Sequence, residues 1–247
     1  MLNPERVFGL IGFPLSHSFS KKYFTEKFQK ENIPGCHYEL FPIESVSEVR
    51  NIIGTNPAIC GLNVTIPYKE TVIPYLDYMT DTVRQIGACN CIKITDGKLT
   101  GHNTDVIGFE KMLLPFIKTY HDKALVLGTG GAAKAVAWVF HKLGIEYKYV
   151  SRESGENKIS YRDIDIHLMN ICKIVVNTTP LGMAPNLDGV PDIPFDLISE
   201  RHLFVDLIYN PAKTRFLSMA EKNGATIVNG MEMLIIQAEE SWKIWNH

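Results

Sequence analysis

Four short segments within the first 105 residues are rich in hydroxyl and amide side chains. Between them they also carry the ammonium group of Lys69 and the carboxylate of Asp105. Hydroxyls and amides bind ring hydroxyls, while an ammonium and a carboxylate can exchange protons with a bound molecule. This set of groups suits a small polyol acid as substrate. The segments are 14–20, 63–69, 87–90 and 103–105.

Each of these segments lies at or just past the end of an apolar run that predicts a β-strand. Open α/β sheets bind their ligands at such strand ends. The predicted strands of this part are 7–12, 38–43, 59–67 and 87–95, and helical spacing covers 19–32, the region around 45–54 and 69–75.

A glycine-rich loop follows the next predicted strand, which runs from Lys123 to Gly128. Gly128 allows a tight turn, Gly130 lets a pyrophosphate approach the backbone, and Ala133 permits close packing of helix on strand. The free N–H groups of the helix that follows attract phosphate. We predict a dinucleotide site, with a turn that binds nothing as the alternative. Its residues are Gly128, Thr129, Gly130, Gly131 and Ala132.

The end of the following strand, 147–152, bears on the choice of cofactor. NAD sites place an acidic residue there, whereas this strand ends on Ser151 and Arg152. An arginine pairs with a 2′-phosphate and a serine can hydrogen-bond it, which favours NADP. Glu153 comes next and would repel a phosphate if it pointed inward, so NAD stays possible. A solvated surface arginine is the alternative interpretation.

The alternation of strands and helices predicts an α/β protein of two domains with a cleft between them. We expect an N-terminal α/β substrate-binding domain over 1–105, joined by the C-terminal helix 231–247, and a Rossmann-like dinucleotide-binding domain over 106–230. The later predicted elements are helices 131–143 and 213–223 and strands 173–180, 203–209 and 225–230.

Composition narrows the class of protein further. The chain has 247 residues, 45% of them hydrophobic, with 25 basic and 27 acidic side chains. It shows no clustered basic face for nucleic acid, no apolar run of ~18 residues for a membrane and no secretory signal. Five cysteines, an odd number, suit a reducing cytosol. Cys89 and Cys91 lack a second ligand pair, so we expect no metal.

Taken along nearly its whole length, the sequence resembles the shikimate dehydrogenase family. The motifs HSFS, NVTIPYK, GACN, HNTD, GTGGAAKA, NTTPLGM, DLIYNPAKT and NGMEMLIIQA occur in this order. The resemblance implies reversible, NADPH-dependent reduction of 3-dehydroshikimate to shikimate on the way to chorismate and the aromatic amino acids.

The resemblance also implies roles for individual residues. Lys69 and Asp105 would be the catalytic pair, and the C-terminal helix would return to the first domain. The implied substrate-binding residues are Ser18, Ser20, Asn63, Thr65, Asn90, Tyr209 and Gln237. Besides the glycine loop and Ser151 with Arg152, the implied cofactor-binding residues are Asn177, Thr178, Leu207 and Gly230.

Several alternatives stay open at this point. Ser18 and Ser20 could cap the helix that follows them, and Asp105 could be a helix N-cap. Burial would lower the pKa of Lys69 and a nearby carboxylate would raise it, so its acid–base role is a hypothesis. Val106 follows the aspartate where the family usually has glycine.

Three other functions compete with the main one. An NAD-linked quinate/shikimate dehydrogenase needs only small changes in the pocket. A non-catalytic, cofactor-binding regulator would share the fold but would not need Lys69 and Asp105. A methylenetetrahydrofolate dehydrogenase-like enzyme has a similar layout but no use for the paired serines. Monomer and homodimer both remain open.

Overall fold

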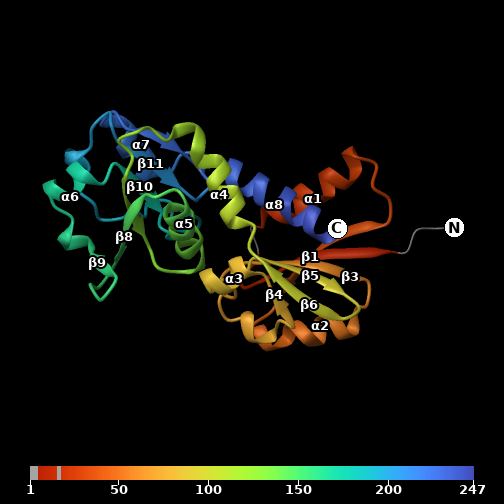
Figure 1. Cartoon of the computed structure of the whole chain (residues 1–247). Helices are drawn as coiled ribbons and strands as arrows, with labels where there is room; N and C mark the ends of the chain where they lie inside the picture. The colour runs from red at the N-terminus through yellow and green to blue at the C-terminus, as the bar shows by residue number, and fades with distance from the viewer. Residues whose placement is uncertain (1–4, 16–17) are drawn as a thin grey trace. The chain divides into compact units, whose positions relative to one another are not determined.

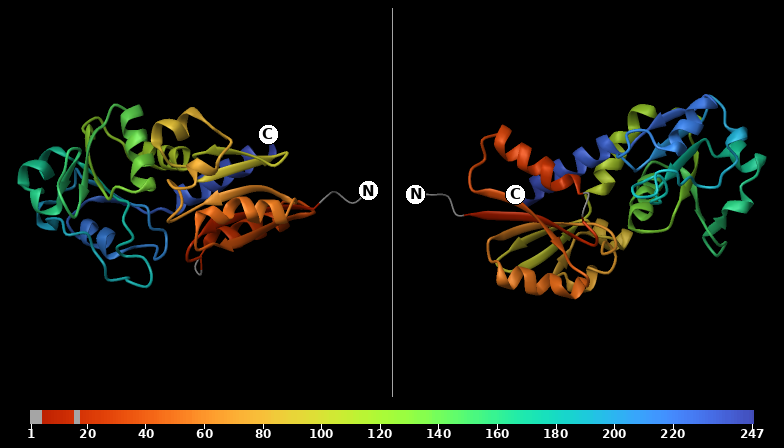
Figure 2. Two further views of the ribbon diagram at one scale, coloured as in Figure 1. Left: turned by 90° about the horizontal axis from the view of Figure 1, so that it is seen from below. Right: turned by 180° about the vertical axis from the view of Figure 1, so that it is seen from behind.

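The computed structural model describes residues 5–15 and 18–247. His17, within the polar segment 14–20, lies outside the described residues. The chain divides into two compact units, one of Met1–Thr104 with Ala238–His247 and the other of Asp105–Gln237. The second division falls inside the last helix, α8 (Met231–Asn246). Figures 1 and 2 trace the chain through both units.

The first unit is built on a mixed six-stranded sheet with the order β2-β1-β3-β5-β6-β4. The strands β1, β2 and β3 run parallel, whereas β5 is antiparallel to both β3 and β6. The elements are β1 (Arg6–Gly12), α1 (Phe19–Lys30), β2 (Cys36–Pro42), α2 (Val49–Thr55), β3 (Ile59–Val64), β4 (Tyr78–Met79), α3 (Asp81–Ile86), β5 (Cys91–Thr95) and β6 (Lys98–His102).

Both faces of this sheet are buried, and β1 shows the alternation that this requires. Val7 and Ile11 point into a core shared with helix α2, whereas Phe8 and Leu10 point into a core on the other face. Helices α1 and the C-terminal part of α8 cover that other face (Figure 1). The C-terminal part of the last helix, from Ala238 onward, therefore contributes to the core of the first unit.

The second unit contains a parallel six-stranded sheet with the order β12-β11-β10-β7-β8-β9. Helices α6 and α7 contribute to the core on one face, while α5 packs on β7 and β8. Its elements are α4 (Asp105–Leu113), β7 (Lys123–Leu127), α5 (Gly131–Lys142), β8 (Glu146–Ser151), β9 (Lys158–Ser160), α6 (Ile166–Ile171), β10 (Ile174–Asn177), β11 (Leu203–Asp206), α7 (Arg215–Lys222) and β12 (Thr226–Val228). The predicted α/β class and parallel sheet are confirmed.

The structure corrects the expectation of a helix over 69–75. Only a single 3₁₀ turn forms there, at Ile73–Tyr75, because Pro74 has no N–H group with which to continue a helical ladder. The predicted strand 59–67 ends at Val64, and the predicted strand 87–95 begins only at Cys91. Within residues 5–15 and 18–247, no helix is long and apolar enough to cross a lipid bilayer.

Candidate active site

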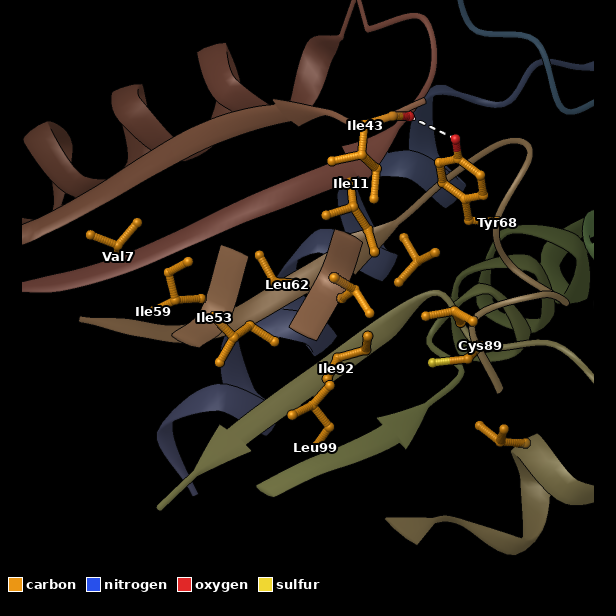
Figure 3. Packing of buried hydrophobic residues seen from close by; sticks show 14 residues of the cluster. Val7, Ile11, Ile43, Ile53, Ile59, Leu62, Tyr68, Cys89, Ile92 and Leu99 are labelled. Carbon is orange, nitrogen blue, oxygen red and sulfur yellow. Dashed lines mark hydrogen bonds between the residues drawn. The ribbon is translucent and has the colours of Figure 1, made fainter. Parts of the chain in front are cut away.

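The backbone at Lys69 is held from both sides. The preceding residue, Tyr68, is buried in the core of the first unit and donates a hydrogen bond of 2.6 Å to the carbonyl of Ile43, drawn in Figure 3. The carbonyl of Lys69 accepts a bond of 2.7 Å from the N–H of Cys89. These contacts leave the Lys69 side chain half-buried at the end of β3, beside the segment that carries Asn90.

Thr65 stands at the start of the same loop. Its N–H donates to the carbonyl of Ile11 at 3.0 Å, which ties the loop to the end of β1. Its methyl group packs on Gly12, where a Cβ atom would lie only 2.5 Å from Thr65 Cγ2. The glycine therefore allows the loops after β1 and β3 to approach one another closely.

Asn63 lies at the centre of a buried polar network in the first unit. Its Oδ1 accepts a hydrogen bond of 2.9 Å from the Tyr38 hydroxyl. Its Nδ2 donates to Ser241 Oγ at 2.9 Å and to the carbonyl of Asn90 at 3.3 Å. The Tyr38 hydroxyl also bonds Ser20, and burial raises the pKa of Tyr38 well above its usual value. The phenol is therefore neutral and can donate to Asn63.

Asn90 is bound to Thr104 by both main-chain and side-chain contacts. The N–H of Thr104 donates to Asn90 Oδ1 at 2.6 Å, and Asn90 Nδ2 donates to Thr104 Oγ1 at 3.0 Å. The Thr104 hydroxyl is also 3.3 Å from Ser241 Oγ. Three predicted substrate residues, Ser20, Asn63 and Asn90, thus belong to one network.

Ser18 occupies the N-cap position of α1, yet its side chain makes no capping hydrogen bond. Its Oγ is buried and has no hydrogen-bond partner among the described residues. Ser20 lies within the helix and bonds Tyr38. Neither hydroxyl therefore serves as the helix cap that we considered as an alternative, and a buried hydroxyl without a partner is unusual in a folded protein.

Sequence reasoning missed three members of the network: Tyr38, Thr104 and Ser241. Thr104 was passed over between Asn103 and Asp105. Ser241 could have been found, because it lies four residues after Gln237 and residues at that spacing share one face of a helix. Tyr38 could not have been found from the sequence. A tyrosine in a predicted buried strand gives no indication of whether its hydroxyl bonds a residue of a ligand site.

The remaining predicted substrate and catalytic residues belong to the second unit. Asp105 is the first residue of α4 and is almost completely buried. It is inside the helix, so the expected N-cap alternative does not apply. Tyr209 and Gln237 are half-buried, and Gln237 Nε2 donates to the carbonyl of Leu234 at 2.8 Å. The glycine expected after the aspartate is replaced by Val106, which is buried in α4.

The glycine loop has the geometry that a phosphate site requires. Gly128 has a positive φ of 112°, and a Cβ atom there would lie 2.5 Å from Thr178 Oγ1. Gly130 is the N-cap of α5, and no atom lies within 4 Å of the place where its Cβ would stand. The first glycine is thus required by the backbone and by a neighbour, whereas the second leaves open space beside the helix N-terminus. Thr129 is exposed there, while Gly131 and Ala132 are half-buried.

Asn177 lies at the end of β10, and its side-chain amide forms hydrogen bonds with other residues of the protein. Its Nδ2 donates to Asp206 and to the carbonyl of Leu181, and its Oδ1 accepts from the N–H and hydroxyl of Thr179. Its side chain is fully buried. We therefore infer that Asn177 acts by shaping the loop after β10. Thr178 donates to the carbonyl of Leu127 at 2.6 Å, which joins that loop to β7.

Asp206, at the end of β11, is a buried carboxylate that sequence reasoning did not single out. Burial raises its pKa from 3.8 to about 6, although bonds from Thr214, Ile208 and Asn177 act in the opposite direction. The chain just beyond it is held by Gly230, whose N–H donates to the carbonyl of Ile208 at 3.1 Å. A Cβ on Gly230 would collide with the backbone of Leu207, so glycine is needed at this approach.

The strand β8 ends in a tight turn. The hydroxyl of Ser151 donates to the carbonyl of Glu153 at 2.6 Å, and the side chains of Arg152 and Glu153 are exposed. Arg152 is thus available in solvent at the strand end where a dinucleotide ribose binds in this class of fold.

The comparisons with known proteins agree with this architecture. The family described as "Shikimate dehydrogenase substrate binding domain" matches residues 10–92. A shikimate dehydrogenase (NADP(+)) of Clostridium beijerinckii is 39% identical, over 96% of this chain and 91% of its own. The chain belongs to the shikimate dehydrogenase family. The predicted family is thereby confirmed.

Solved structures of the shikimate dehydrogenase family have the same fold. The crystal structure of shikimate dehydrogenase 1 from Peptoclostridium difficile aligns with a TM-score of 0.86 at 35% identity, covering 98% of this chain and 91% of its own. The shikimate 5-dehydrogenase of Thermus thermophilus, in complex with NADP(H) and shikimate, aligns with a TM-score of 0.83 at 27% identity, covering 97% and 93%.

Proposed function

We propose that this protein is an NADP-dependent shikimate dehydrogenase that reversibly reduces 3-dehydroshikimate to shikimate. The observation that carries the proposal is the buried network of Ser20, Tyr38, Asn63 and Asn90, together with the buried hydroxyl of Ser18, which has no partner among the described residues. The members of the network satisfy one another, whereas burying the hydroxyl of Ser18 without a partner is costly unless a ligand bonds it. Family membership supplies the substrate that such a cluster suits.

In the reductive direction, Lys69 donates a proton to the ketone oxygen of the substrate while the carbon receives a hydride. Family membership implies Asp105 as the second catalytic residue, and the reverse reaction returns the proton to Lys69. Ser18 and Ser20 bind the carboxylate, and Thr65, Asn63 and Asn90 bind the remaining oxygens. Family membership implies Tyr209 and Gln237 as further substrate-binding residues.

The glycine loop fits NADP, because the space beside Gly130 is open at the N-terminus of a 12-residue helix. The cofactor supplies the hydride. Gly128, Thr129, Gly131 and Ala132 shape the pyrophosphate loop, Ser151 and Arg152 bind the 2′-phosphate, and Thr178, Leu207 and Gly230 border the nicotinamide. The second unit would thus bind the cofactor, while most of the proposed substrate-binding residues belong to the first. We expect the enzyme in the cytoplasm, and a homodimer is possible in solution.

Absorbance at 340 nm tests the proposal directly. Purified protein is mixed with shikimate or quinate and with NADP or NAD. We expect the cofactor to be reduced fastest when shikimate is combined with NADP. We expect the rate of this reaction to fall about 10²–10⁴-fold in Lys69→Ala. The control is Lys93→Ala, which removes another half-buried lysine of the first unit, on β5.

Each other outcome has a defined meaning. Preference for quinate or NAD would replace the proposal with the quinate-type dehydrogenase. Cofactor binding without turnover on any pair would point to a regulator. The 2′-phosphate contact is tested separately by Arg152→Ala, which should raise KM for NADP and leave KM for NAD unchanged.

A further inference from the structure

Ser241 on α8 links the C-terminal helix to the polar network of the first unit. Its side chain is fully buried, and its Oγ accepts a hydrogen bond of 2.9 Å from Asn63 Nδ2. The same oxygen lies 3.3 Å from Thr104 Oγ1. Ser241 therefore contacts Asn63 at the end of β3 and Thr104 after β6, and Thr104 in turn bonds Asn90, which lies directly before β5.

The bonds around Asn63 determine which of its groups a ligand can use. Nδ2 has two hydrogens, and they go to Ser241 Oγ and to the carbonyl of Asn90. Because a main-chain carbonyl can only accept, the orientation of the amide is defined. Oδ1 accepts from Tyr38 and keeps one lone pair. Asn63 in this arrangement can accept a hydrogen bond from a ligand hydroxyl but has no hydrogen left to donate.

We propose that Ser241 is a positioning residue for substrate recognition, and this rests on the proposed function. By engaging one Nδ2 hydrogen, it keeps the Asn63 amide oriented with Oδ1 as its available group. The site then selects a ring hydroxyl that donates at this position. Tyr38 holds the opposite end of the same amide, so the two residues act on Asn63 together.

Replacing Ser241 by alanine would leave a hydrogen of Asn63 Nδ2 without its partner inside the protein. The amide would then be free to turn, and its acceptor would be available for only part of the time. We expect KM for shikimate to rise about tenfold, which is what the loss of one buried hydrogen bond produces. We expect kcat to change much less and KM for NADP to stay constant.

A control on the same helix separates amide positioning from docking of the helix. Trp245 Nε1 donates a buried hydrogen bond of 3.0 Å to the carbonyl of Ile92, and phenylalanine at this position removes that bond while keeping an aromatic ring against Gly61 and Tyr38. Trp245→Phe should therefore lower the melting temperature with little change in KM for shikimate. An equal rise of KM in both variants would show that Ser241 only docks the helix, and would overturn the proposal.

A double-mutant cycle with Tyr38→Phe tests whether both residues act through Asn63. The rise of KM in the double variant should differ from the product of the rises in Ser241→Ala and Tyr38→Phe, because both residues bond the same side chain, Asn63. Independent, multiplicative effects would contradict the proposal. Ser241→Cys, which keeps the size and bonds more weakly, should give an intermediate KM and covers the case in which the alanine variant fails to fold.

Turnover of shikimate by the unaltered protein separates a failure of the proposed function from a failure of the role assigned to Ser241. If the unaltered protein does not oxidise shikimate, the proposed function fails and this inference falls with it. If it does, and Ser241→Ala is folded with an unchanged KM for shikimate, only the role of Ser241 is wrong.

Discussion

The indole ring of Trp245 occupies the space in which a side chain on Gly61 would have to stand. A Cβ atom built on Gly61 falls among the ring atoms of the tryptophan, which is only 4% exposed. Strand β3, which contains Gly61, also carries Asn63, and helix α8 carries Ser241. The glycine thus allows the strand that carries Asn63 and the helix that carries Ser241 to approach one another closely.

Replacing Gly61 by alanine should disturb both stability and substrate binding. The added methyl group would push the indole away, and overpacking of this kind costs about 1–3 kcal/mol. Urea unfolding measures that loss, and KM for shikimate should rise as well. The matched control is Gly54→Ala on α2, where a Cβ meets no atom within 4 Å. It should leave stability unchanged or raise it by about 0.5–1 kcal/mol. Equal stability of the two variants would contradict the packing argument.

Ser18→Ala should weaken shikimate binding without destabilising the protein. The hydroxyl is buried and has no partner among the described residues, so its removal costs no protein hydrogen bond. We expect KM for shikimate to rise about tenfold and the melting temperature to stay constant or increase. Ser20→Ala is the contrast, because it also removes the bond to Tyr38 and should lower the melting temperature. An unchanged KM in Ser18→Ala would remove this residue from the carboxylate site.

The two glycines of the phosphate loop should respond differently to alanine. Gly128→Ala forces a side chain into a left-handed backbone against Thr178 and should destabilise the second unit by about 1–3 kcal/mol. Gly130→Ala adds a methyl group in open space with φ at −80°, so stability should hold while KM for NADP rises. Thermal unfolding measures the change in stability, and titration with NADP measures the change in cofactor binding. A stability loss of equal size in both variants would argue against the assignment of Gly130.

Asp206 should make the second unit less stable as pH rises from about 4 to about 6. Its pKa is raised from 3.8 to about 6 by burial, so the unfolded chain ionises first and the folded chain carries the cost of a buried charge above pH 6. The loss is on the order of 2–3 kcal/mol. Urea unfolding between pH 4 and pH 7, compared with Asp206→Asn, isolates this contribution. If the free energy of unfolding changed with pH in the same way in the unaltered protein and in Asp206→Asn, this contribution of Asp206 would be refuted.

The sequence by itself determined the elements whose signals are local. Alternating apolar residues, as in β1, and a glycine loop between strand and helix need no distant partner, because steric limits and helix dipoles act within a few residues. The glycine loop could therefore be predicted from its local pattern, whereas Ser18, Asn63 and Asn90 were implied as site residues by the resemblance to the family. The helix expected over 69–75 failed for an equally local reason, the missing N–H of Pro74.

Only the tertiary structure decided which hydrogen-bonding groups of the implied site residues remain available to a ligand. Asn63 and Ser241 are 178 positions apart, yet they share a hydrogen bond because α8 returns to the first unit beside β3. Asn177, which the resemblance implied as a cofactor residue, also bonds Asp206, Leu181 and Thr179, and these partners could not be read from the sequence. Hydrogen bonds between distant elements depend on the packing that brings those elements together, and residue type and spacing carry no record of that packing.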